Sequence, residues 1–210
     1  MVMQKTHDGN YREYPVDPEE LAAKLRTIQP ADTGFIKPNS GVIFVSSKGK
    51  SRVVAAYRPP QITGIWLEGS ETALRVPMPG LVVMKHLPTG STNVVALAGE
   101  PELEAQLYDA PVANVSGAHG HVCWGTVSVP VIPEDSTDLR PLWDAFFGTR
   151  FANHGTARKS LKHPSDVRSM LIQLHDSGAK KYPVEDLVPL STQTETVTLA
   201  KLLKYGRGSV

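Results

Sequence analysis

Short runs of β-branched and aromatic residues follow one another between residue 41 and about residue 99. Turn residues such as Lys48-Gly49-Lys50 and Glu68-Gly69-Ser70 separate the runs, and each run has the length of a strand. The pattern predicts strands at 41–47, 52–57, 62–67, 72–76, 81–86 and 93–97. Because connections this short cannot hold crossover helices, an antiparallel meander is predicted.

Apolar residues at helical spacing precede this region. Asp17 is suited to cap a helix, Pro18 to occupy its first position and Glu20 to complete a capping box. Leucine and isoleucine then recur at helical spacing until Pro30. A helix is therefore predicted over 17–30, after a polar arm at residues 1–14.

Further helices are predicted after the meander. A brief one covers 101–107, and a second, rich in aromatic residues, covers 139–147. A third begins with Ser165 as its cap and ends at Gly178, and the last covers 195–205. The fold class is therefore α+β, with residues 15–210 forming a single domain and residues 1–14 a flexible N-terminal arm.

Composition and charge exclude several classes of function. Of the 210 residues 40% are hydrophobic, and 22 basic side chains balance 21 acidic ones, so no global field attracts nucleic acid. The one basic cluster (Arg158, Lys159, Lys162 and His163) is interpreted as a solvated face. No glycine-rich phosphate-binding motif is present, and no nucleotide or other cofactor is expected.

The compartment is predicted from the N-terminus, the apolar runs and the cysteine count. No run approaches the roughly 20 apolar residues of a membrane span, and the N-terminus resembles no secretory leader. The single cysteine, Cys123, cannot form an internal disulfide. We therefore expect a cytoplasmic location without membrane contact, where the thiol stays reduced.

Cys123 lies in a segment rich in glycine, histidine and amide groups, from Asn114 to Gly125. One interpretation follows from the alternation in 121–129, which places Cys123 on the buried face of a strand. The other is a reactive thiol, which needs access, a thiolate form and donors for a tetrahedral oxyanion. Asn114 carries a suitable amide donor, and His119 or His121 is positioned in sequence to assist deprotonation.

Two other uses of the thiol have weaker support in the sequence. His119, His121 and Cys123 alternate as zinc ligands would, but a fourth ligand at metal spacing is missing, so no metal is expected. A papain-like hydrolase needs a distant histidine, for which His154 and His163 are the candidates, but nothing local supports it.

The stretch from Leu107 through Val129, with Asn114 and then Val-Cys-Trp-Gly, resembles the prokaryotic ubiquitin-conjugating-enzyme-like proteins. The stretch from Leu142 to His154, Leu-Trp-Asp-Ala-Phe-Phe-Gly-Thr-Arg-Phe-Ala-Asn-His, shares the resemblance. Within that family the residues look most like the group called PRTRC system protein B. Those proteins belong to bacterial gene cassettes that also encode a ThiF-like activating enzyme.

The resemblance implies a ubiquitin-conjugating-like fold, with an antiparallel meander flanked by N-terminal and C-terminal helices. It implies that Cys123 matches the thioester-forming cysteine and Asn114 the asparagine that stabilises the oxyanion. The chain departs from the eukaryotic His-Pro-Asn pattern, because Val112-Ala113 precedes Asn114, and the interval to the cysteine is slightly longer than usual. Asn114 is therefore either an oxyanion donor or a purely structural residue.

The leading hypothesis is a transferase that receives a ubiquitin-like protein from a ThiF-like activating enzyme as a thioester on Cys123. The acyl group then passes to an amine of an acceptor whose identity the sequence does not reveal. Two alternatives stay open. One is a non-catalytic binding module of the same fold, and the other a plasmid-maintenance structural protein that acts through protein contacts alone.

Overall fold

The computed structural model describes residues 2–5, 11–14, 17, 19, 32–35, 41–48, 51–87, 90–117, 119–191 and 195–208. The helix predicted over 17–30 lies outside the described residues except at its start. There the backbone N–H of Glu19 donates to the Asp17 carboxylate over 2.8 Å, the bond expected of an N-cap.

Two short strands lie near the N-terminus, β1 (Val2–Lys5) and β2 (Tyr11–Tyr14). They pair with each other as an antiparallel two-stranded sheet and, within the described residues, with no strand of the other sheets. The division into an arm at 1–14 and one domain at 15–210 stays a prediction.

The main sheet has eight strands in the order β11-β12-β9-β8-β5-β4-β3, with β10 also paired to β9. Its strands are β3 (Asp32–Phe35), β4 (Val42–Lys48), β5 (Ser51–Arg58), β8 (Gly80–Leu87), β9 (Thr92–Leu97), β10 (Leu107–Asp109), β11 (Val115–Ser116) and β12 (His121–Val122). A three-stranded sheet holds β6 (Gln61–Leu67), β7 (Leu74–Met78) and β13 (Arg150–Phe151).

The predicted strands and their antiparallel order are confirmed, and prolines explain why the meander is divided between two sheets. Arg58 pairs with Leu81, and three residues further along each strand Gln61 pairs with Met78, so one register continues through both sheets. The ladder is interrupted at 59–60 and 79, where the residues are prolines that lack the N–H a ladder needs. The segments β5–β6 and β7–β8 therefore form one long hairpin with a break.

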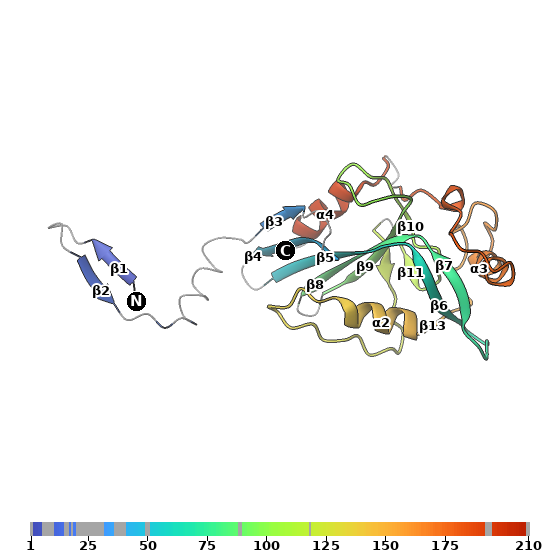
Figure 1. Ribbon diagram of the computed structural model, residues 1–210, viewed down its shortest axis with the longest axis horizontal. Coiled ribbons are helices and arrows are strands. Elements are labelled where there is room, and N and C mark those ends of the chain that lie inside the picture. The colour runs from blue at the N-terminus through green and yellow to red at the C-terminus, as the bar shows by residue number, and fades with distance from the viewer. Residues whose placement is uncertain are drawn as a thin grey trace.

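Helices cover both faces of the main sheet (Figure 1). On one face, Leu142 and Phe146 of α2 (Arg140–Gly148) join Val54, Val83 and other sheet residues in one buried cluster. On the other face, Leu202 and Leu203 of α4 (Leu199–Gly208) pack against residues of β5, β8 and β9. Each fully buried leucine or phenylalanine contributes about 1.5–3 kcal/mol, so both faces hold the sheet in place.

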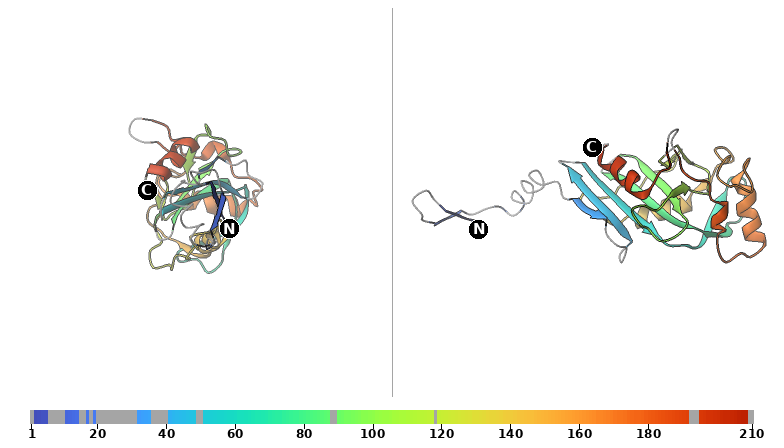
Figure 2. Two further views of the ribbon diagram at one scale, coloured as in Figure 1. Left: turned by 90° about the vertical axis from the view of Figure 1, so that its left-hand side faces the viewer. Right: turned by 90° about the horizontal axis from the view of Figure 1, so that it is seen from above.

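The third helix, α3 (Val167–Asp176), packs against β7 at the end of the molecule farther from α4 (Figure 2). Its position agrees with the prediction, but the cap is Asp166, whose carboxylate accepts from the Arg168 backbone N–H, and not Ser165. Gly178 ends the helical turn with a φ of 62°, a conformation that glycine adopts without strain.

Two predictions near the C-terminal helix are corrected. No helix forms over 101–107, because this segment leads into β10, and α4 begins at Leu199 and not at 195. The reason is long-range pairing: the Leu107 N–H donates to the Val197 carbonyl, and Gln106 bridges Thr198. Extended pairing between these two segments displaces the local helical preference of both.

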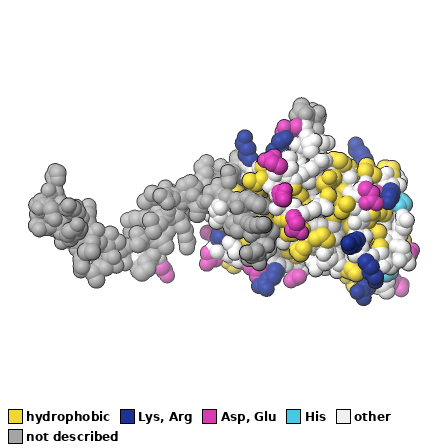
Figure 3. All heavy atoms as spheres, turned by 45° about the horizontal axis from the view of Figure 1, so that its top comes forward, with side chains coloured by type: hydrophobic (Ala, Val, Ile, Leu, Met, Phe, Trp, Pro, Cys, Tyr) yellow, Lys and Arg dark blue, Asp and Glu magenta, His cyan; other side chains and the backbone are white. Residues whose placement is uncertain are grey.

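The described surface carries acidic and basic side chains interspersed with hydrophobic ones, and Figure 3 shows this on one face. Among the helices of the described residues, none combines the length and apolar character that crossing a membrane requires.

Candidate functional site

The site is built on the hairpin of β11 and β12, in which Val115 pairs with Val122 and Ser116 with His121. Glycines shape its turn: Gly117 has a φ of 75° and Gly120 a φ of 66°. A Cβ added at Gly120 would overlap the carbonyl oxygen of Val94 on β9. Position 120 therefore needs glycine both for its backbone conformation and for the close approach to the main sheet.

The hairpin is fixed to β9 by two hydrogen bonds. The Val94 N–H donates to the Gly120 carbonyl over 2.7 Å. The amide of Asn93, which is 3% exposed, donates to the His119 carbonyl over 3.0 Å. Since buried polar groups are costly to leave unpaired, these bonds hold the turn against the sheet.

Cys123 follows β12 directly and is exposed. The interpretation of Cys123 as a buried strand residue is therefore wrong. The chain leaves the strand after Val122, because Gly125 has a φ of 57° and the Val127 N–H donates back to the Trp124 carbonyl. The alternation in 121–129 is that of a strand, but a turn interrupts it.

Asn114 lies beside Cys123 at the open end of the hairpin. Its carbonyl oxygen accepts from the Cys123 N–H over 2.7 Å, continuing the register of β11 and β12 by one pair. Asn114 has a φ of 63°, a left-handed conformation that asparagine tolerates better than most residues. The structure thus brings together the two residues that the sequence singled out.

The Asn114 side chain faces β13. Its Oδ1 accepts from the Ala152 N–H over 3.3 Å, and its Nδ2 donates to the Arg150 carbonyl over 3.5 Å, a long hydrogen bond. These two backbone groups flank Phe151 and are those that a neighbouring strand would use. The amide of Asn114 therefore takes the place of a peptide group beside β13 and ties the hairpin to it.

Trp124 anchors the chain on the other side of Cys123. Its ring and that of Phe146 on α2 form a T-shaped pair, with 6.3 Å between ring centroids and an interplanar angle of 80°. Phe146 in turn contacts Phe151 on β13 at 5.3 Å. Such edge-to-face pairs contribute about 0.5–1.5 kcal/mol beyond burial. An exposed thiol thus lies between two anchored neighbours.

Neither His119 nor His121 forms a hydrogen bond with the Cys123 thiol that would position it as a base. The ring of His119 stacks on Tyr205 of α4, with 3.9 Å between centroids and 5° between planes. His121 is exposed. Of the distant candidates, His163 contacts Gln173 through Nε2 at 3.0 Å, and His154 is exposed. Across the described part of the chain, no group of three or more metal-ligating side chains gathers.

In the basic cluster at 158–163, Arg158 and Lys162 are exposed, as a solvated face requires, but Lys159 departs from that interpretation. Lys159 is 5% exposed, and its Nζ lies 3.9 Å from the Asp109 carboxylate. Burial lowers the pKa of Lys159 and raises that of Asp109, and each charge partly offsets the effect on the other. Lys162 lies 3.6 Å from Glu185. Lys159 therefore anchors the segment, whereas the pair of Lys162 and Glu185 is exposed and contributes little.

Sequence reasoning missed Tyr205 as a support of the site. It lies on α4, more than 80 residues beyond the hairpin, and a helical tyrosine gives no signal of which loop it will stack on. It also missed Arg150 and Phe151. They form β13, and a strand of only two residues leaves no recognisable pattern in the sequence.

The main sheet has helices on both faces, and the cysteine loop is held by Asn114 and Trp124. These features define the class of protein: it is E2-like, with the fold of the ubiquitin-conjugating enzymes. The family model of the prokaryotic E2 family D matches residues 19–190, and the chain belongs to that family. The expected α+β, ubiquitin-conjugating-like fold is thereby confirmed. No curated protein and no solved structure shows significant similarity to the chain.

Proposed function

We propose that this protein carries a ubiquitin-like protein as a thioester on Cys123 and transfers it to an acceptor amine. The observation that supports this most directly is the exposed thiol between two anchored neighbours, Asn114 and Trp124, in a member of an E2 family. A reactive cysteine needs access together with a fixed position.

The proposed reaction has two steps. The Cys123 thiolate attacks the carbonyl of a thioester on the activating enzyme, and that enzyme's thiolate leaves. An amine then attacks the carbonyl on Cys123, an amide bond forms, the Cys123 thiolate leaves and the amine loses a proton. Exchange between thioesters is nearly balanced in energy, so the protein contributes positioning and oxyanion stabilisation.

The partners belong to the same proposal. A ThiF-like activating enzyme supplies the ubiquitin-like protein, as in the cassettes of the PRTRC system protein B group, with which we also place this chain. A cytoplasmic, reducing compartment suits this chemistry, because disulfide formation would block the single thiol.

Within this proposal Asn114 acts mainly as a positioning residue. Both ends of its side-chain amide are hydrogen-bonded to β13, and its carbonyl oxygen receives the Cys123 N–H. The same observation favours the second candidate function, a binding module of the E2 fold that docks a ubiquitin-like protein without carrying it, because the amide is occupied by a structural contact.

One experiment separates the two candidates. The protein is mixed with ATP, a ThiF-like enzyme and a ubiquitin-like protein, and the products are run on a non-reducing gel. The transferase gives an adduct that thiol reagents cleave. Cys123→Ser gives a more stable oxyester, and Cys123→Ala gives none. An unmodified Cys123 under these conditions, with the activating enzyme loaded, selects the binding module.

A further inference from the structure

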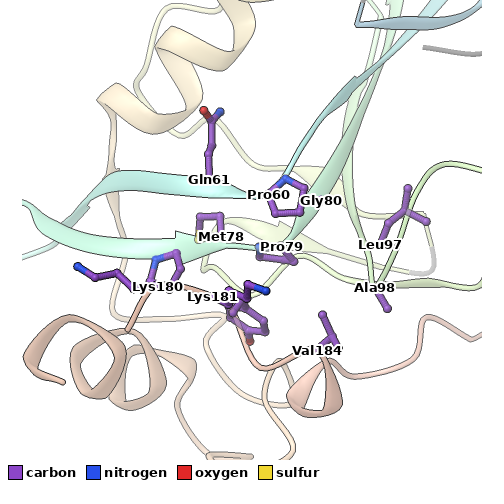
Figure 4. Close-up of a pocket in the computed structure, with 12 residues that line it drawn as sticks. Pro60, Gln61, Met78, Pro79, Gly80, Leu97, Ala98, Lys180, Lys181 and Val184 are labelled. Carbon is purple, nitrogen blue, oxygen red and sulfur yellow. The ribbon is translucent and has the colours of Figure 1, made fainter. Parts of the chain in front are cut away.

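A pocket of about 390 Å³ lies where the long hairpin is broken by prolines. Pro60, Pro79 and Gly80 form one side, and Leu97 and Ala98 at the end of β9 form another (Figure 4). The hairpin of Cys123 pairs with β9 at Asn93, near the opposite end of that strand. The pocket is therefore separate from the candidate thioester site.

The third side of the pocket is the segment after α3, with Lys180, Lys181, Tyr182 and Val184. Figure 4 shows Lys181 beside Pro79, and Lys180 farther along the same segment, with its ammonium pointing away from Leu97 and Ala98. The rest of the lining is mainly proline and aliphatic, and none of the described residues that line the pocket is acidic. The pocket is therefore an apolar hollow, and the charged residues among its described lining are the two lysines.

The wall that carries the lysines is held rigidly. Tyr182 is buried, and its hydroxyl donates to the Asp186 carboxylate over 3.3 Å. Asp186 is itself 0% exposed and accepts a second bond from the Lys162 backbone N–H over 2.7 Å. The pocket is thus preformed, which lowers the entropy cost of filling it.

Both lysines are available for a ligand. They are exposed, and within the described part of the chain neither forms an ion pair or a hydrogen bond. A ligand of complementary chemistry has an apolar group for the hollow and carboxylates beside it. The volume lies at the lower end of the range of about 300–1,000 Å³ for ligand sites, so it suits an anchoring side chain more than a large cofactor.

We propose that this pocket docks an acidic peptide segment of a partner protein. One large apolar side chain of that segment enters the hollow between Pro79 and Ala98. Its flanking carboxylates lie against Lys180 and Lys181, where they give the site its preference for acidic sequences. The inference is independent of any thioester on Cys123.

The test uses a fluorescein-labelled peptide of eight residues, in which one phenylalanine is flanked by glutamates, and fluorescence anisotropy at low salt. We expect saturable binding that weakens about tenfold in the double variant Lys180→Glu/Lys181→Glu, since each carboxylate then meets a like charge. Lys204→Glu makes the same kind of charge change on an exposed lysine of α4, and we expect it to bind as the unaltered protein does.

Two further comparisons test the apolar part. Replacing the phenylalanine of the peptide by glycine, or filling the pocket with Ala98→Trp, weakens binding if the side chain enters the hollow. Any of three results overturns the proposal. The glycine peptide binds as tightly as the phenylalanine peptide, Lys204→Glu weakens binding as much as the double variant does, or the double variant has no effect. If Ala98→Trp fails to fold, the charge variants and the glycine peptide still decide the proposal.

Cys123→Ala keeps this test distinct from that of the transferase function. The variant removes every thioester adduct but leaves the pocket untouched, so peptide binding persists in it. Loss of binding in Cys123→Ala would contradict the separation of the two sites.

Discussion

The backbone N–H of Cys123 donates a hydrogen bond to the carbonyl oxygen of Asn114, with 2.7 Å between the two atoms. The bond makes the two residues neighbours across a hairpin whose turn is fixed to β9. Because the Asn114 side chain is tied to β13, the position of the thiol depends on two sheets at once.

This arrangement leads to a prediction for Asn114. Asn114→Gly keeps the left-handed backbone without strain but removes the amide, whereas Asn114→Ala also strains the backbone. We expect both variants to slow thioester loading and transfer alike, with a loss of about 1–2 kcal/mol in the free energy of unfolding for Ala. Single-turnover assays of each step measure this. Normal loading with slow transfer in Asn114→Gly would instead identify an oxyanion donor.

Gly120 is expected to be the most sensitive position of the hairpin. Gly120→Ala pushes a methyl group into the Val94 carbonyl, and we expect a loss of about 3 kcal/mol or more in the free energy of unfolding, measured in urea. Gly117→Ala is the matched control, because its φ is also positive but no atom of the described residues, its chain neighbours aside, lies within 4 Å of the added Cβ. It should cost about 1–2 kcal/mol. Equal losses would show that the hairpin does not pack on β9 as described.

The stacking of His119 on Tyr205 is expected to steady the cysteine loop. Tyr205→Leu removes the stacked ring, which contributes about 0.5–1.5 kcal/mol. We expect faster amide hydrogen exchange at 119–123 and a changed rate of Cys123 alkylation by iodoacetamide. Tyr205→Phe removes only the hydroxyl and keeps the ring, so it should retain the stacking on His119. A similar effect of both variants would assign the support to the hydroxyl.

The free energy of unfolding is expected to decrease as the pH decreases, because of His86. Burial, and to a lesser extent the Lys85 ammonium, lowers the pKa of this residue below its ordinary value of 6.5. Its Nε2 is buried and has no hydrogen-bond partner among the described residues. As pH drops below 6.5, the unfolded chain therefore binds the proton more readily than the folded protein does.

The free energy of unfolding should decrease as the pH falls from 6.5 to the lowered pKa, by at most about 1.4 kcal/mol per pH unit. Above pH 6.5 His86 is neutral in both states, and the full stability is present. Urea unfolding of the unaltered protein and of His86→Phe measures the difference in slope. His154→Gln, at an exposed position, is the control and should keep the slope. An unchanged slope in His86→Phe would contradict the assignment.

Much of the architecture follows from local pattern. The alternating strands between 42 and 97, the helix at 140–148 and the helix that ends before Gly178 all agree with predictions from spacing and turn residues. The pattern succeeded there because each apolar face packs against the core. It failed at 101–107 and 195–198, where two segments distant in sequence pair with each other as extended chain.

The sequence by itself determined that one thiol exists, that an asparagine precedes it by a short glycine-rich loop, and that an antiparallel series of strands is followed by helices. The tertiary structure decided that Cys123 is exposed, that the Asn114 amide bonds to β13, that Lys159 is buried and that Tyr205 supports the hairpin. Exposure and hydrogen-bond partners depend on segments far apart in the chain, and the order of residues along one segment does not specify which distant segment will cover it.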